Sequence, residues 1–221
     1  MNYIISNNVC IIQYANSLLY YDFTQLGQYY FMISSYSDYK FYLERDRIAS
    51  QIPPFDTLSS KIKNLFFPNE QWRFIKALRF LEYCDNVNKG KLGGVIWLFA
   101  KIRFRRISVK YGYSIPINVF GPGLSLPHRG NIIINPNTQI GENCRIYVGV
   151  NIGAHKGKAP KIGNNVYIGP GAIIFGDVTI ADNVSIGANA TVNKSFNESN
   201  VVVAGTPAKI VKTNVPSWNR I

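Results

Sequence analysis

Apolar side chains recur every six residues through the second half of the chain. A helix requires apolar positions about every 3.6 residues, and a strand with one buried face alternates every two, so this period fits neither alone. A six-residue period predicts short strands joined by tight corners, with the aliphatic residue in the core of a stacked parallel coil. The repeated positions are Ile134, Ile140, Ile146 and Ile152, then Ile162, Ile168, Ile174, Ile180, Ile186 and Val192.

A second series lies four residues after these positions and consists of small side chains, which let each corner turn inward. Cys144 belongs to this series, so we expect it to pack in the core and not to act as a nucleophile. The members are Thr138, Cys144, Val150, Val166, Ala172, Val178, Val184 and Ala190.

The period is interrupted twice, between Leu126 and Ile134 and between Ile152 and Ile162. Extra residues cannot enter a six-residue side without shifting every later side chain, so they must project outward at a corner. The chain has two histidines, and each falls in one interruption: His128 in LPHRGN and His155 in GAHKGKAP. A single histidine is usually a surface or core residue, but this coincidence favours a functional role.

Stacking the coils places the two histidines at opposite ends of one side. Leu126 and Ile146 then share one side, and Ile134 and Ile152 share the next, which begins after His128 and ends before His155. Within one subunit the two histidines are too far apart to cooperate. Around a threefold axis, however, such corners can face each other, so we hypothesise a trimer with the site between subunits.

The first half reads as helical. Helices are expected over 37–50, capped by Ser37 or Asp38, over 70–83, and over 95–109 after a break at Gly93-Gly94. The second should bury Trp72, Phe74, Ile75, Leu78 and Leu81. Residues 1–36 hold seven tyrosines and no basic residue, and predict no particular element. We therefore expect a mainly helical domain at 1–110, a β-helix at 111–212 and a tail at 213–221.

Composition narrows the class of protein to which the chain can belong. With 47% apolar and 16% charged residues, the chain is not disordered. It has no apolar stretch of membrane-spanning length, and no basic residue before Lys40 that would begin a signal peptide. Three widely spaced cysteines suit a reduced cytoplasmic protein and offer no metal-ligand spacing, so no metal is expected.

The net charge of +12 includes a dense basic run from Lys101 to Lys110. Nucleic-acid binding is not expected, because no nucleic-acid motif accompanies the run. Two interpretations stay open: a solvated helix face, or attraction to an anionic ligand or membrane surface.

From about 114 to 212 the chain resembles the hexapeptide-repeat acyltransferases, in particular the serine acetyltransferase branch, and most closely the O-acetyltransferases of bacterial capsule and O-antigen loci. The phrases that carry this resemblance are SIPINVFGPGLSLPHRG, IGENCRIYVGVNIG, APKIGNNVYIGPGAIIFGDVTIADNVSIGANA and VVAGTPAKIV. The resemblance implies a left-handed parallel β-helix with 18-residue coils and an N-terminal helical domain packed on it. It also implies acetyl-CoA as donor and a homotrimer or a dimer of trimers.

The resemblance makes His128 the base that takes a proton from the acceptor hydroxyl, without an acyl-enzyme intermediate. The family's histidine-orienting aspartate is Tyr113 here, and its acidic residue before the histidine is Pro127. Its second active-site histidine, preceded by arginine, reads Lys158-Ala159 here. His155 either replaces that histidine or is an exposed loop residue.

These departures remove the groups that would grip serine. We therefore expect the acceptor to be a sugar hydroxyl of a surface-polysaccharide precursor. The alternatives are serine O-acetylation for cysteine synthesis and a non-catalytic assembly protein.

For the donor, the resemblance places small residues along the pantetheine arm, although simple corner packing explains each equally well. It places a Thr-Pro pair against adenine and two lysines toward the phosphates. These residues are Gly153, Ala172 and Ala188, then Thr206, Pro207, Lys209 and Lys212. The terminal Ile221 invites comparison with enzymes that insert such a residue into a partner sulfhydrylase, but SWNRI lacks the usual acidic neighbours, so a cysteine-synthase partner is not expected.

Overall fold

The computed structural model describes residues 2–6, 9–14, 17–22, 32–54, 57, 62, 66, 69–87 and 90–218. The chain divides into two compact units, 1–30 and 31–221. The first holds a three-stranded antiparallel sheet in the order β1-β2-β3, which the sequence did not predict. Its strands are β1 Asn2–Ser6, β2 Val9–Tyr14 and β3 Ser17–Asp22. The helices and the β-helix share the second unit, which therefore spans the expected 110/111 boundary.

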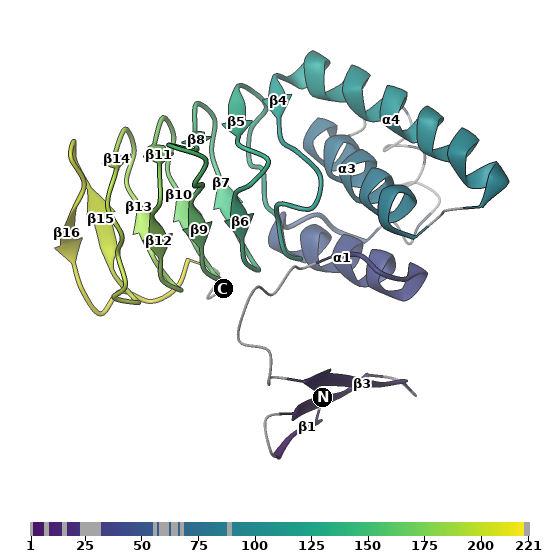
Figure 1. Ribbon diagram of the computed structural model, residues 1–221, viewed down its shortest axis with the longest axis horizontal. Helices are drawn as coiled ribbons and strands as arrows, with labels where there is room; N and C mark the ends of the chain where they lie inside the picture. The colour runs from purple at the N-terminus through teal and green to yellow at the C-terminus, as the bar shows by residue number, and fades with distance from the viewer. Residues whose placement is uncertain are drawn as a thin grey trace. The chain divides into compact units, whose positions relative to one another are not determined.

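The second unit contains a parallel β-helix with three sheets (Figure 1). We call them sheet I (β7, β10, β13, β15, β16), sheet II (β4, β5, β8, β11, β14) and sheet III (β6, β9, β12). The strands are β4 Tyr113–Ser114, β5 Ile132–Ile134, β6 Gln139–Ile140, β7 Arg145–Ile146, β8 Asn151–Gly153, β9 Lys161–Ile162, β10 Tyr167–Ile168, β11 Ile173–Phe175, β12 Thr179–Ile180, β13 Ser185–Ile186, β14 Thr191–Val192, β15 Val202–Ala204 and β16 Lys209–Lys212.

The register confirms the predicted stacking. Ile146 pairs with Ile168 in sheet I, and Ile134 pairs with Ile152 in sheet II. All ten repeated aliphatic positions are at most 5% exposed, and the series of small side chains is equally buried. Burial therefore supplies most of the driving force for stacking one coil on the next.

At six of the eight small positions, the residue just before the inward small side chain is in the left-handed region. Asparagine and glycine adopt this conformation most readily, which explains their regular spacing along the repeat. The corner residues with positive φ include Asn143, Gly149, Asn165, Gly171, Asn183 and Asn189.

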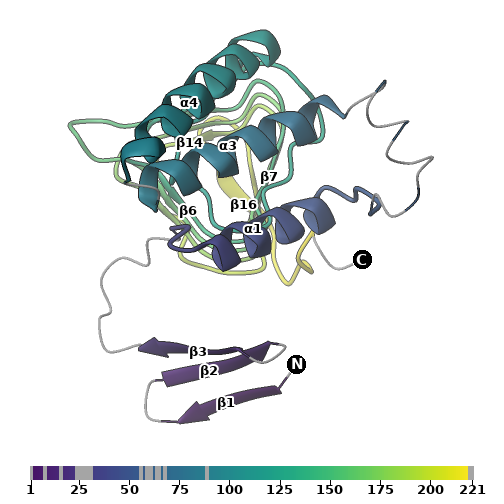
Figure 2. The same ribbon diagram turned by 90° about the vertical axis from the view of Figure 1, so that its right-hand side faces the viewer.

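Three helices cover the first-coil end of the β-helix (Figure 2): α1 Tyr36–Ala49, α3 Glu70–Asn86 and α4 Lys91–Tyr111. The expected cap of α1 was wrong, because the Ser35 hydroxyl accepts the Asp38 amide. The expected break at Gly93-Gly94 was also wrong, since α4 begins at Lys91. One or two glycines cost a helix only about 1 kcal/mol each, and Gly93 is buried. The predicted burial of the α3 side chains is confirmed.

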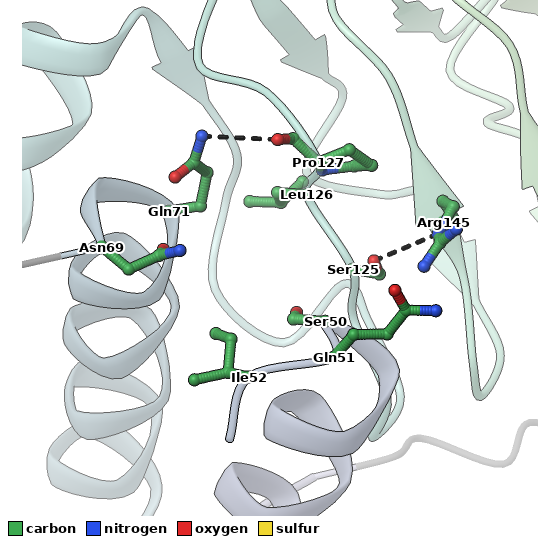
Figure 3. A pocket seen from close by; sticks show the side chains of 9 residues that line it. All are labelled: Ser50, Gln51, Ile52, Asn69, Gln71, Ser125, Leu126, Pro127 and Arg145. Carbon is green, nitrogen blue, oxygen red and sulfur yellow. Dashed lines mark hydrogen bonds between the residues drawn. The ribbon is translucent and has the colours of Figure 1, made fainter. Parts of the chain in front are cut away.

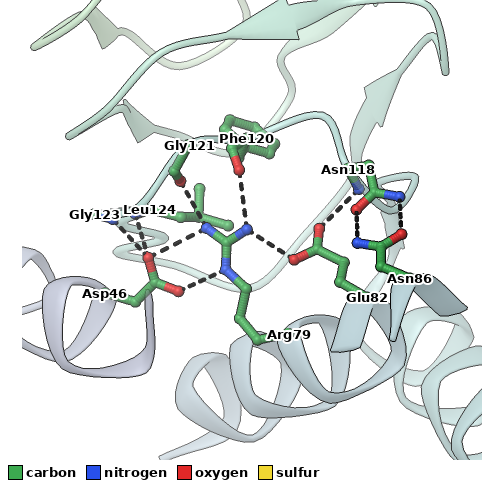
Figure 4. A network of polar contacts seen from close by, with 9 residues as sticks. All are labelled: Asp46, Arg79, Glu82, Asn86, Asn118, Phe120, Gly121, Gly123 and Leu124. Carbon is green, nitrogen blue, oxygen red and sulfur yellow. Dashed lines mark hydrogen bonds and ion pairs between the residues drawn. The ribbon is translucent and has the colours of Figure 1, made fainter. Parts of the chain in front are cut away.

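A buried ionic network joins the helices to the first coil (Figure 4). Arg79 is fully buried and uses all five of its donors: three on Asp46 and Glu82, and two on the carbonyl oxygens of Phe120 and Gly121. Burial would lower the pKa of Arg79, but the two carboxylates outweigh it and raise that pKa. Asp46 also accepts the Gly123 and Leu124 amides, and Glu82 accepts the Asn118 amide. The network thus satisfies backbone groups at the end of the coil.

At the other end of the stack, β16 turns back antiparallel on β15. The tail then returns along the β-helix, where the Trp218 indole donates to the Asn143 carbonyl and lies under the Arg145 guanidinium. Ile221 lies outside the described residues. No helix among the residues described has the length and apolar character to cross a membrane.

Candidate functional site

His128 lies in an outward loop at the corner between sheets I and II. Ser125 still bridges to Arg145 of sheet I, and Ile132 already pairs in sheet II. Between them the Gly130 amide donates to the Tyr111 carbonyl, and the Asn131 carbonyl accepts the Gly149 amide. The two extra residues therefore leave the coil here, as predicted, and His128 is exposed.

The main chain of His128 is held by a buried phenol. The Tyr113 hydroxyl donates to the His128 carbonyl oxygen at 2.9 Å, so the residue at the family's aspartate position does contact His128, but not its ring. Burial raises the pKa of Tyr113, which keeps the phenol a donor. The imidazole instead faces the Tyr147 ring, with centroids 5.9 Å apart, and Tyr147 in turn lies 5.2 Å from the Tyr167 ring.

The first turn of α3 braces the loop on both sides of His128. The Gln71 amide donates to the Pro127 carbonyl at 3.4 Å. Arg129 forms an ion pair with Glu70 at 2.7 Å. Because the helix end is fixed by its Asn69 cap, these contacts hold the loop against a rigid element.

A cavity of about 250 Å³ lies beside this loop (Figure 3). It lies between the end of α1, the start of α3 and the segment from Ser125 to Pro127. Its lining is largely polar and includes one guanidinium, that of Arg145, which also donates to Ser125 and to the Ala49 carbonyl. The lining residues are Ser50, Gln51, Ile52, Asn69, Gln71, Ser125, Leu126, Pro127 and Arg145.

His155 lies at the other end of sheet II, at the corner that leads to sheet III. Its backbone exchanges two hydrogen bonds with Lys158, which closes the four extra residues into a tight outward turn. Lys158 is paired with Asp177 at 2.6 Å, and this contact raises the pKa of the lysine. The two histidines therefore occupy opposite corners of one subunit, as the stacking predicted.

The residues expected to bind the donor fall into two groups, one at the His128 corner and one at the His155 corner. Thr206 contacts the Asn189 carbonyl, next to exposed Ala188, so Ala188, Thr206 and Pro207 follow the corner that carries His128. Gly153 precedes the His155 turn.

Lys209 and Lys212 are exposed on β16, at the end of the stack. Neither forms an ion pair with a residue that the structure describes.

Ala172 differs from the other residues of the expected set. Its side chain is fully buried, its carbonyl accepts the Asn151 amide and its amide donates to the Gly169 carbonyl. Its small side chain therefore packs in the coil, and its backbone groups pair within the stack.

The sequence analysis did not predict three residues of the candidate site, which contact the His128 loop or line the cavity: Tyr147, Gln71 and Arg145. Tyr147 had a detectable signal, because it lies one coil below the His128 interruption on the same side. Gln71 and Arg145 had none, since one comes from a distant helix and the other occupies an ordinary outward strand position. Within the described ranges, no group of three or more histidine, cysteine or acidic side chains is placed to hold a metal ion.

The coil, its period and its outward loops are typical of hexapeptide-repeat proteins. The profile of the family "Bacterial transferase hexapeptide (six repeats)" matches residues 159–194. The chain is 42% identical over 96 residues to a serine acetyltransferase of Staphylococcus xylosus, covering 42% of this chain and 44% of that protein. It is 38% identical over 95 residues to the serine acetyltransferase of Helicobacter pylori, covering 41% and 55%. The chain thus spans about half the length of these curated relatives.

Solved structures show the same fold, a left-handed parallel β-helix preceded by helices. The serine acetyltransferase of Neisseria gonorrhoeae superposes with a TM-score of 0.61 at 25% identity, covering 82% of this chain and 69% of that one. A serine acetyltransferase solved in complex with CoA superposes with a TM-score of 0.59 at 21% identity, covering 80% and 71%. The helices that precede the coil are therefore part of the shared architecture.

Proposed function

We propose that this protein is an acetyl-CoA-dependent O-acetyltransferase in which His128 is the catalytic base. The observation that carries the proposal is an exposed imidazole on a braced outward loop, whose preceding residue, Pro127, lines a cavity of about 250 Å³. The 42% identical relatives, which are serine acetyltransferases, support the reaction type.

The reaction needs one proton acceptor and no covalent intermediate. Neutral imidazole takes the proton of the acceptor hydroxyl as its oxygen attacks the acetyl carbonyl carbon. The carbon–sulfur bond of the thioester then breaks, and the imidazolium returns the proton to the departing CoA sulfur. Tyr113 and Gln71 hold the backbone of the loop, and the Tyr147 ring limits where the imidazole can turn.

The corner that carries His128 also supports the path of the donor. Ala188 presents little side chain there, so a pantetheine arm can approach the backbone closely. Thr206 and Pro207 continue along the same corner, and Lys209 and Lys212 add positive charge beyond them for the phosphates. Gly153 lies at the opposite corner, so a contribution from it requires a second subunit.

We infer a trimer in which the His128 corner of one subunit meets the Gly153–His155 corner of the next. The outer face of sheet II, between the two corners, exposes Ile133, Ile173 and Phe175 at 49%, 43% and 39%. Apolar side chains on such a face support contact with another copy. A native mass near three times 24.9 kDa is expected; a fully active monomer contradicts the trimer.

The acceptor has two candidates. The serine acetyltransferases among the relatives favour serine, and none of them supports a polysaccharide role. The residues that depart from the family's pattern favour an uncharged acceptor such as a sugar hydroxyl. Tyr113 and Pro127 replace two acidic residues, and the Lys158 ammonium is already paired with Asp177. The cavity also offers mainly neutral polar groups around Arg145. We place serine first, and the sugar hydroxyl second on the strength of these contacts.

The decisive experiment is CoA-thiol release from acetyl-CoA with serine, and separately with a panel of nucleotide-sugars and oligosaccharides. His128→Ala should lower turnover by roughly two to four orders of magnitude with the true acceptor. His155→Ala tests the trimer separately, since in that assembly the His155 corner of one subunit meets the His128 corner of the next. Undiminished turnover in the His128 variant contradicts the assignment, and no release with any acceptor favours a non-catalytic protein.

A further inference from the structure

Helix α4 turns an apolar face toward solvent. Leu92, Phe99 and Val109 are 80%, 69% and 77% exposed, and Val95, Ile96, Leu98 and Ile102 are exposed as well. Scattered exposed hydrophobic residues are ordinary, but six of these seven lie between Leu92 and Ile102 at helical spacing and so form one patch.

The opposite face of α4 packs against the protein. Ala100, Ile107 and Tyr111 are buried, and Phe104 packs against the core of the unit. These residues recur at helical spacing, and the Trp97 indole on the same side donates to Asp85 of α3. The exposed apolar residues are therefore not a loosely packed core face; they form a second, outward face.

Basic side chains accompany this outward face. Lys101, Arg103, Arg105, Arg106 and Lys110 are all exposed, and α4 contains no acidic residue. None of the five forms an ion pair with a residue in the described part of the chain. Apolar residues dominate the first half of the helix, and basic residues dominate the second.

We propose that the outward face of α4 (the α4 face) binds the surface of an anionic lipid bilayer. Such a surface accepts both parts of the face: the apolar side chains enter the boundary between headgroups and acyl chains, and the long basic side chains reach the anionic headgroups.

Two other binding partners would match only the apolar part or only the basic part of the α4 face. A second copy docked face to face through α4 would set five cations against five with no acidic residue on either helix. A nucleic-acid backbone would pair with the cations but would leave Leu92, Val95 and Phe99 without an apolar partner. Charge complementarity and apolar burial together therefore favour lipid.

The test is flotation of the full chain with vesicles of phosphatidylcholine alone, and with vesicles that also contain phosphatidylglycerol. We expect recovery with the anionic vesicles only, and weaker recovery at raised salt. Arg105→Glu combined with Arg106→Glu should lower the affinity at least about tenfold. Val95→Ser combined with Phe99→Ser should lower it as well, without changing the charge.

The matched control is Lys161→Glu combined with Lys194→Glu, which makes the same charge change at exposed positions on the β-helix. Circular dichroism and CoA-thiol release in solution confirm that each variant is folded. Binding that is absent, equal on neutral vesicles, or equally lowered by the control overturns the proposal. So does a fall in native mass in the α4 variants without vesicles, which would show that a second copy covers the face.

Discussion

The residues around His128 control its backbone more tightly than its ring. Tyr113 and Gln71 hold the carbonyl groups of His128 and Pro127, whereas the imidazole has an aromatic neighbour in Tyr147. A base that must face both a hydroxyl and a thioester needs this kind of placement, because a small displacement costs much of the rate.

Tyr113→Phe tests this placement. The change removes the hydrogen bond to the His128 carbonyl and leaves the ring packing intact, so we expect kcat to fall by about two- to tenfold with little change in the KM for acetyl-CoA. The free energy of unfolding should fall by about 1 kcal/mol. Steady-state thiol release and urea denaturation measure the two effects. Tyr83→Phe, the same chemical change at a half-buried position on α3, is the control and should leave kcat unchanged.

At the scale of elements, the helices and the first coil are joined by a polar contact inside an apolar interface. The Asp46–Arg79–Glu82 network replaces the next coil, whose amides and carbonyls would otherwise pair with this edge. Side chains from the helices thus complete the hydrogen bonding at the open edge of the first coil. This protects that edge from pairing with other chains.

Arg79→Met should destabilise the protein by about 3–5 kcal/mol, because it leaves two buried carboxylates without a partner. Denaturation in urea measures this loss. Arg129→Met breaks an ion pair whose arginine is 66% exposed, so it should cost less than about 1 kcal/mol. Equal losses for the two variants would show that the buried network contributes no more than a surface pair.

At the scale of the whole molecule, one corner carries the proposed base near the helices and Lys209, a proposed phosphate-binding lysine, at the far end of the stack. The stacked coils fix the separation between them. A donor bound as proposed would therefore lie extended along a straight edge of the stack.

Lys209→Glu tests the far end of this edge. We expect weaker acetyl-CoA binding in isothermal titration, and the difference from the native chain should shrink as salt rises, because the contact is a charge on phosphate. Lys161→Glu is the control, since Lys161 is exposed on β9 of sheet III, away from this corner. Unchanged affinity in the Lys209 variant would remove this residue from the site.

The sequence by itself determined the repeating part of the molecule. The six-residue period predicted the rungs, the inward place of Cys144 and the outward loops at His128 and His155. The period predicted these features correctly because each coil repeats the environment of the coil before it, so a local pattern describes the whole stack.

Only the tertiary structure decided what surrounds those loops. Arg79 meets the first coil 41 residues away along the chain, at Phe120, and Gln71 reaches Pro127 across 56. The sealed position of Ala172 and the bond from Tyr113 to the His128 main chain also depend on where neighbouring coils and helices lie. No periodicity encodes such contacts, because each occurs once and joins segments with different geometries.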